Sequence, residues 1–223
     1  MMTKTNPLPS HLLDPALLTR RHFALYGAAA GLFLTGLPAD AWARIDASPE
    51  RAAEVRFLGK ADAAVTVAEY FSMTCGHCGR FHRNTFPQVK ADLIDTGLIR
   101  FEMHPFPLDG LALRAHALCR ALPTDSYFKM VDILLDKQED WIGAADPVAE
   151  LKKYAKFAGV SSSGFDEIMQ NRPYLEAIVQ IRQDAASRHQ LSSTPSFVVN
   201  DSKTFSGALS YDEFLAELNA FGI

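Results

Sequence analysis

Apolar and polar residues along the chain follow two different periods. "EVRFLG" (54–59), "AAVTVAEYFS" (63–72) and "LIRFEMHPF" (98–106) are β-branched and aromatic runs of strand length. Between the last two, from Cys75 to about Thr96, apolar residues recur every three or four positions, which predicts a helix. Gly97 should end this helix and Pro87 should kink it. Strand, helix and strand in this order predict two parallel strands joined by a crossover helix.

Residues 108–190 carry a helical period and no further strand pattern. The period predicts about four helices, in "LALRAHALCRAL", "SYFKMVDILLDKQ", "DPVAELKKYAKFAG" and "PYLEAIVQIRQDAASRH". Strand signals return in "PSFVVN" (195–200) and "KTFSG" (203–207), before a closing amphipathic helix that Ser210 should cap. The sequence therefore predicts an α/β fold in which two β-containing pieces, 44–107 and 191–223, flank an all-helical insertion at 108–190.

Residues 1–43 have the pattern of an export signal. Arg20 and Arg21 precede an apolar stretch of 14 residues, Ala24 to Leu37, and Ala41-Trp42-Ala43 offers a cleavage site with small residues. The stretch is too short to span a membrane comfortably. "TRRHFAL" also resembles the twin-arginine pattern, so we expect export to the bacterial periplasm by that route. An uncleaved amphipathic anchor is the alternative.

Composition narrows the function only a little. The chain has 223 residues, 48% of them hydrophobic, which is enough for a packed core. Its 22 basic and 26 acidic residues give a net charge of −4, and no basic cluster is present, so nucleic acid is not expected as a partner. Three cysteines allow at most one intramolecular disulfide. A chain of this size can fold without one, so stability is not expected to be the main role of a disulfide here.

"SMTCGHCGRF" (72–81) places Cys75 and Cys78 between a predicted strand and a predicted helix. Unpaired backbone N–H groups and the positive end of the helix dipole should stabilise a thiolate at Cys75, and a partly cationic His77 should add to this. Cys78 lies one turn further on, within disulfide reach and more covered. We therefore predict that Cys75 attacks and Cys78 resolves. A stabilised thiolate makes the disulfide form a better oxidant, which favours an oxidase over a reductase.

Other uses of the pair are less well supported by the sequence. Tetrahedral zinc needs four ligands, and only Cys119, His82, His104 and His116 could complete the set. Covalent haem attachment requires a His directly after the second Cys, where the chain has Gly79. A purely structural disulfide across two residues would constrain the unfolded chain little. We expect no metal and no cofactor, with a metal-handling thiol protein as the open alternative.

Several segments together resemble the DsbA-like thiol:disulfide oxidoreductases of the bacterial cell envelope. They are "EYFSMTCGHCGRF", the long helical segment, "STPSFVVN" and "FSGALSYDEFLAEL", and the resemblance covers nearly all of the chain after residue 43. It implies a thioredoxin fold with a helical insertion and a periplasmic enzyme that passes its disulfide to cysteine-containing exported proteins. It also implies a quinone-linked membrane partner of the DsbB type. Because no separate dimerisation domain is evident, we expect a monomer.

The resemblance also implies roles for individual residues. Pro195 would be a cis proline facing the cysteine pair, and the backbone of Thr194 would pair with an extended substrate segment. Glu69 would be a buried carboxylate with a raised pKa that takes a proton from Cys78 through water. The alternatives are a trans proline that starts a strand and a solvent-facing strand glutamate.

Gly-His between the cysteines is a departure, because the most oxidising members of the family have Pro-His there. Gly-His also occurs in eukaryotic disulfide isomerases, so an envelope reductase or isomerase remains the alternative function. Cys119 and Trp141 are expected to be core residues. His82 is expected to be solvated, and His104 and His116 to lack local partners.

Overall fold

A computed structural model describes residues 45–223; the predicted export signal lies outside these residues. Its centre is a mixed five-stranded sheet with the order β1-β3-β2-β4-β5. The strands are β1 (Phe57–Leu58), β2 (Val65–Phe71), β3 (Ile99–Pro105), β4 (Ser196–Val199) and β5 (Lys203–Ser206). β2 and β3 are parallel, which confirms the predicted strand, helix, strand unit, and the pairs β1–β3, β2–β4 and β4–β5 are antiparallel.

The helices fall into two groups according to their place in the chain. Those close to the strands in sequence are α1 (Pro49–Ala53), α2 (Gly76–Asn84), α3 (Phe86–Val89), the π-helix η4 (Lys90–Ile94), α10 (Tyr211–Leu218) and the short 3-10 helix η5 (Asn219–Phe221). Those between β3 and β4 are α4 (Gly110–Ala121), α5 (Thr124–Asp136), α6 (Gln138–Ile142), α7 (Pro147–Phe157), α8 (Ser162–Gln170) and α9 (Arg172–His189). Within residues 45–223, no helix has the length and apolar character needed to cross a bilayer.

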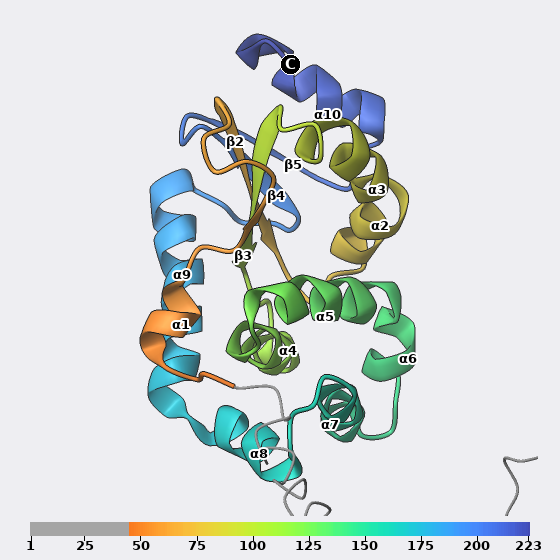
Figure 1. The fold of residues 1–223 in the computed structure, drawn as a ribbon, viewed down its shortest axis with the longest axis vertical. Helices are drawn as coiled ribbons and strands as arrows, with labels where there is room; N and C mark the ends of the chain where they lie inside the picture. Colours follow the sequence, from red (N-terminus) through yellow and green to blue (C-terminus); the bar gives the residue numbers. More distant parts are fainter. Residues whose placement is uncertain (1–44) are drawn as a thin grey trace, which may run out of the picture. The chain divides into compact units, whose positions relative to one another are not determined.

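The helices cover the sheet unequally. Figure 1 shows α2, α3 and α10 on one side of the sheet and α9 with α1 on the other, while α4 to α8 gather beyond the end of the sheet at which β2 stops. Side chains alternate along β2 and β3, so Val67, Glu69 and Phe71 face the α2 side, while Ala68 and Tyr70 belong to a second cluster that α9 covers.

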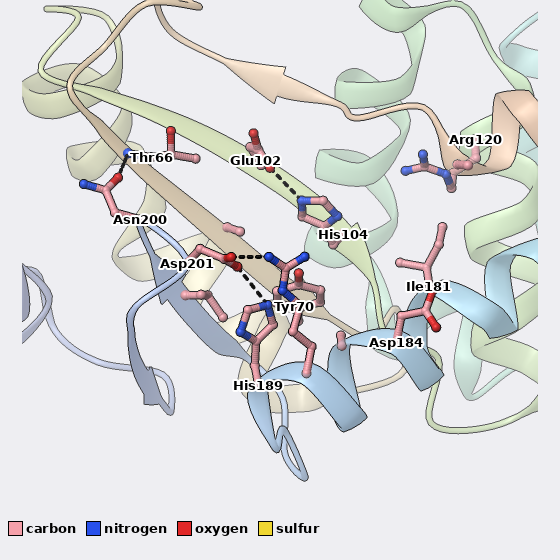
Figure 2. Close-up of a pocket in the computed structure, with 15 residues that line it drawn as sticks. Thr66, Tyr70, Glu102, His104, Arg120, Ile181, Asp184, His189, Asn200 and Asp201 are labelled. Carbon is pink, nitrogen blue, oxygen red and sulfur yellow. Dashed lines mark hydrogen bonds and ion pairs between the residues drawn. The ribbon is translucent and has the colours of Figure 1, made fainter.

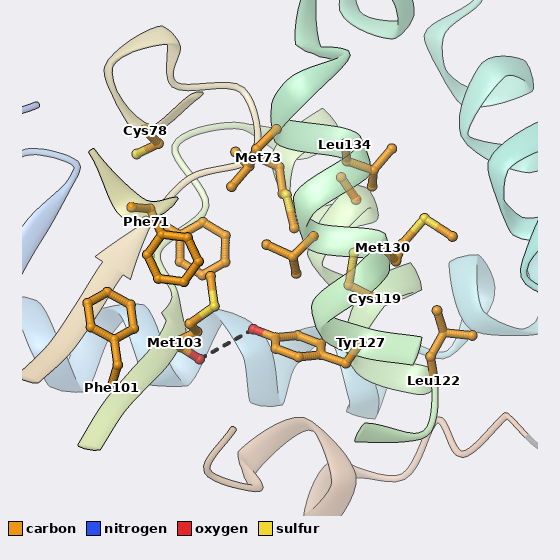
Figure 3. Close-up of a cluster of buried hydrophobic side chains, with 14 of the residues drawn as sticks. Phe71, Met73, Cys78, Phe101, Met103, Cys119, Leu122, Tyr127, Met130 and Leu134 are labelled. Carbon is orange, nitrogen blue, oxygen red and sulfur yellow. Dashed lines mark hydrogen bonds between the residues drawn. The ribbon is translucent and has the colours of Figure 1, made fainter. Parts of the chain in front are cut away.

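The main core joins the sheet to the helices between β3 and β4. Figure 3 shows Phe71 and Met103 of the sheet next to Tyr127 and Met130 of α5, with Cys78 at the edge of the same cluster. The hydroxyl of the buried Tyr127 donates a hydrogen bond to the Met103 carbonyl at 3.4 Å. The end of β2, from which the cysteine loop departs, is therefore held by helices that follow it by some 40 residues or more in the chain.

Three local predictions differ from the structure. Residues 108–190 contain six helices rather than about four, because the short α6 and the Gly-containing α8 interrupt or weaken the apolar period. Strand pairing in 54–59 is limited to Phe57–Leu58. The helix after Cys75 breaks at Thr85, two residues before Pro87, and resumes as α3 and η4. The break fits Pro87, which has no N–H to donate to the carbonyl of Arg83 and whose ring crowds that carbonyl in a continuous helix.

Candidate active site

The two cysteines occupy different positions at the start of α2. Cys75 is the N-cap residue, with an extended backbone (φ −80°, ψ 115°), and its side chain makes no capping hydrogen bond. It is partly exposed, whereas Cys78 is fully buried in the main core. Both are free thiols in the structure. The prediction of Cys75 at the helix start is therefore confirmed, and one sulfur is accessible while its neighbour is enclosed.

The segment before β4 lies against Cys75. The Thr194–Pro195 peptide bond is cis, as the resemblance implied. In its protonated form, the Cys75 thiol donates a hydrogen bond to the Thr194 carbonyl at 3.3 Å. Residues separated by 119 positions in the chain thus meet at the exposed sulfur.

The surroundings drive the pKa values of the two thiols in opposite directions. A hydrogen bond from the Cys78 thiol, aided by the Thr194 side chain and the backbone N–H groups of Cys78 and His77, lowers the pKa of Cys75 to about 5. Burial raises the pKa of Cys78, and the hydrogen bond that it gives to Cys75 and the nearby Glu69 charge raise it further. Cys75 is thus a thiolate at neutral pH and Cys78 a thiol.

A buried acid–base pair lies next to Cys78. Glu69, which points from β2 toward α2, is completely buried, which rules out the solvent-facing alternative. Its Oε2 accepts a hydrogen bond from His82 Nε2 at 3.0 Å. His82 is only 7% exposed, so the expectation that it is solvated was wrong. It follows Cys78 by one helical turn, and residues four apart share a helix face.

A glutamine from the helical segment holds the cysteine loop through two hydrogen bonds. The buried Gln138, the first residue of α6, donates hydrogen bonds to the carbonyls of Met73 (2.9 Å) and Cys75 (3.0 Å). A Cβ atom at Gly79 would lie 2.1 Å from the Gln138 Oε1. A side chain at position 79 would therefore displace Gln138.

The remaining predicted residues lie in separate places. His77 is exposed and acts on Cys75 through its backbone N–H. Cys119 and Trp141 are buried in the core as expected. His116 is also buried, with no hydrogen bond at either ring nitrogen, but His104 does have a local partner, Glu102. Within residues 45–223, no three His, Cys, Asp or Glu side chains group as metal ligands.

Sequence reasoning missed two residues of this site. The sequence could have predicted that His82 lies near Cys78, because a spacing of four residues places both on one face of α2. The position of Gln138 could not have been predicted from local sequence, because its contact with the cysteine loop joins residues 63 or more positions apart.

A mixed sheet of this strand order, with a Cys-X-X-Cys pair at a helix start facing a cis proline, defines a dithiol protein of thioredoxin fold. The profile of the thioredoxin family matches residues 52–220. The chain belongs to that family, and the expected fold class is confirmed.

Two similar proteins show how far the likeness in sequence extends. A Rickettsia conorii protein named "Putative protein-disulfide oxidoreductase" is 30% identical over 148 residues, which are 66% of this chain and 53% of that protein. Disulfide bond formation protein D of Bacillus subtilis is 27% identical over 164 residues, covering 70% of this chain and 72% of that protein. The chain spans about half the length of the Rickettsia relatives that it matches.

A solved structure shares the same fold. The crystal structure of Wolbachia pipientis alpha-DsbA1 superposes with a TM-score of 0.68 at 24% identity, covering 75% of this chain and 90% of that one. The likeness that the sequence suggested to DsbA-like proteins thus extends to the fold.

Proposed function

We propose that the protein is a thiol:disulfide oxidoreductase of the DsbA type that introduces disulfides into exported proteins through the Cys75–Cys78 pair. The observation that carries this proposal is the contrast between an accessible Cys75 with a pKa of about 5 and a buried Cys78 whose pKa is raised. The names of the Rickettsia and Bacillus relatives support the same activity.

The proposed reaction transfers two electrons from the substrate to the enzyme. A substrate thiolate attacks Cys75 Sγ in the disulfide form, the Cys75–Cys78 bond breaks, and Cys78 leaves with the electron pair and takes up a proton. A second substrate thiolate then attacks the substrate sulfur of the mixed disulfide. The substrate disulfide forms, and Cys75 is released as a thiolate, which its hydrogen bonds stabilise.

The direction of transfer follows from which form the protein stabilises. Hydrogen bonds to the Cys75 thiolate exist only in the reduced protein, so they favour reduction of the enzyme and oxidation of the substrate. We therefore favour an oxidase over the envelope reductase or isomerase that Gly76-His77 leaves open.

Thr194 and Pro195 are proposed to receive the substrate. The Thr194 carbonyl already faces Cys75, and β4 begins only two residues later. A substrate segment in extended conformation can pair with this backbone while its cysteine reaches Cys75. We also propose that residues 108–190 form an insertion in a thioredoxin-like domain made of 44–107 and 191–223, and that Gln138 is its link to the site.

The proposed location and partners rest on the sequence. Residues 1–43 are proposed to direct export to the periplasm by the twin-arginine route and to be removed there. Because each turnover reduces the pair, an electron acceptor must reoxidise it, and a quinone-linked membrane protein of the DsbB type is proposed for this role. The enzyme is proposed to act as a monomer without a bound cofactor.

The decisive experiment is the redox equilibrium of the purified protein with glutathione buffers. An oxidase should have a potential more positive than about −180 mV, whereas a value near the −270 mV or so of thioredoxin would contradict the proposal and favour a reductase. Metal analysis of the same preparation tests the third alternative. A metal-handling protein would co-purify with metal that is lost in Cys75→Ser.

A further inference from the structure

Cys78 lies beside a buried Glu69–His82 pair that the reaction above does not use. Glu69 comes from β2, the strand that leads into the cysteine loop, and His82 comes from the same helix as Cys78. Both side chains are at least 97% buried, and their charged atoms are 3.0 Å apart. The Glu69 carboxylate is close enough to Cys78 for its charge to act on the thiol.

Each member of the pair has one polar atom without a partner. Glu69 Oε1 and His82 Nδ1 are buried and make no hydrogen bond. The imidazole packs against the rings of Phe71, Phe81 and Phe86, with ring centroids 4.7 to 5.9 Å apart. Burying unpartnered polar atoms among aromatic rings costs stability, so packing alone does not explain these residues.

His82 also borders a cavity on the outer side of α2. The cavity has a volume of about 450 Å³ and lies between α2, α3 and α5. Its charged lining residues are His82, Arg83, Lys90, Asp132 and Asp136. Burial raises the pKa of Asp132, and the nearby His82 offsets part of this rise. One imidazole therefore contacts the carboxylate near Cys78 on one side and this polar cavity on the other.

We propose that His82 is a positioning and proton-relay residue, which orients the Glu69 carboxylate toward Cys78 and exchanges protons between Glu69 and the cavity. The proposal deepens the proposed function and rests on it, since it assigns the route by which the resolving thiol gains and loses its proton.

In this relay, the proton of Cys78 has a defined source and a defined destination at each step. When the Cys75–Cys78 bond is reduced, Cys78 leaves as a thiolate and takes up the proton that His82 holds, which passes through Glu69 and an intervening water. His82 is then reprotonated from the cavity. In the reverse direction the Cys78 thiol gives its proton to Glu69 and attacks Cys75 Sγ. The Cys75–Cys78 bond forms, the partner sulfur of the mixed disulfide leaves as a thiolate, and the proton leaves by way of His82.

The charges around His82 determine how the relay responds to pH. Glu69 faces it from β2, Asp132 and Asp136 from α5, Lys90 from η4, and Arg83 belongs to its own helix. Three carboxylates and two cations therefore surround the imidazole.

The test is a single-turnover oxidation of the reduced protein by glutathione disulfide, with acid quenching and mass spectrometry. Cys75 first forms a mixed disulfide with glutathione, and Cys78 then resolves it. His82→Gln keeps a donor for Glu69 but cannot carry a proton. We expect it to slow the second step by about tenfold near neutral pH, less than the loss of a direct general base because Glu69 remains, and to leave the first step within twofold of the unmodified protein.

The pH profile separates a relay from a structural role. At high pH hydroxide removes the Cys78 proton directly, so the deficit of His82→Gln should shrink as pH rises. His82→Ala, which opens the site toward the cavity, should be rescued by added imidazole. A His82→Gln profile identical to that of the unmodified protein, or a slowed His82→Ala variant that imidazole does not accelerate, would overturn the relay.

The matched control is His104→Gln, which removes a similar histidine from its carboxylate partner on the other side of the sheet. Its second step should stay within twofold of the unmodified rate, and thermal unfolding checks that each variant is folded. The outcome is separate from the proposed function, because glutathione disulfide tests proton transfer whichever way electrons flow in the cell. A thioredoxin-like potential in the unmodified protein would contradict the oxidase while leaving this comparison valid.

Discussion

The sheet carries two glutamate–histidine pairs, one on each face. Glu69 pairs with His82 at 3.0 Å on the α2 side, and Glu102 pairs with His104 at 2.9 Å on the other. The register explains the separation: Glu69 lies opposite Met103, while its neighbours Ala68 and Tyr70 lie opposite Glu102 and His104. Figure 2 shows the second pair in a pocket between the sheet and α9.

The surroundings of the two pairs differ. Glu102 also contacts Arg100, His104 stacks on Tyr70, and both side chains are 15 to 18% exposed in a pocket of about 740 Å³. A neighbouring polar cluster joins Asp201 to Arg188 and His189 (Figure 2). Neither the Glu102–His104 pair nor the Asp201 cluster contacts a cysteine. An acid–base pair thus acquires a catalytic context only when it is enclosed beside a reactive group.

The largest expected difference between the two faces is in catalysis. Cys75→Ser removes the nucleophile, so the rate of disulfide exchange with a reduced peptide should fall by more than about 10³-fold. Glu102→Gln alters the opposite face and should change that rate by less than about twofold. A comparable loss in both variants would mean that the open face takes part in the reaction.

The second expected effect is on the pH dependence of stability. The Cys75 thiol ionises near pH 5 in the folded protein and near pH 9 when unfolded, so its thiolate stabilises the reduced fold increasingly from pH 5 to 9 and not below 5. The Tm of the reduced form minus that of the oxidised form should therefore rise by a few degrees between about pH 5 and pH 8. Calorimetry of both forms measures this difference. A constant difference would contradict the lowered pKa.

The third effect concerns how tightly the α2 face is packed. Gly79→Ala displaces Gln138 from the two carbonyls that it holds, so we expect a net loss of about 1 to 2 kcal/mol in the free energy of unfolding. Gly76→Ala is the matched control, because nothing lies within 4 Å of the added Cβ. Alanine favours a helix over glycine, so this variant should be neutral or more stable by up to about 1 kcal/mol. Urea unfolding compares the two.

The smallest effect belongs to the open face. The His104 hydrogen bond, with help from Arg100, lowers the pKa of Glu102. Its carboxylate therefore stabilises the fold above the ordinary carboxyl pKa of about 4.3, and this contribution disappears as pH falls through the lowered value. Glu102→Gln should cost less than about 1 kcal/mol near neutral pH and nothing in acid. A larger loss, or one that persists in acid, would show that packing rather than charge is involved.

Local patterns predicted the parts of the fold that depend on neighbouring residues. The strands, the helix start at Cys75 and the parallel pairing of β2 and β3 follow from periodicity and order along the chain. The cis bond before Pro195 came from the family resemblance. The Glu69–His82 pair, the Gln138 hydrogen bonds and the two extra helices depend on tertiary contacts, which composition and period do not encode.

The Gln138 and Thr194 contacts have a consequence for when the protein becomes reactive. They reach Cys75 from 63 and 119 positions further along the chain, so they exist only after the helical segment and β4 have folded. In the unfolded chain the hydrogen bonds from Cys78, Thr194 and the start of α2 are absent as well, so Cys75 is an ordinary cysteine that stays largely un-ionised at neutral pH. The reactive thiolate is therefore a property of the folded protein, and unfolding should slow disulfide exchange at Cys75 near neutral pH.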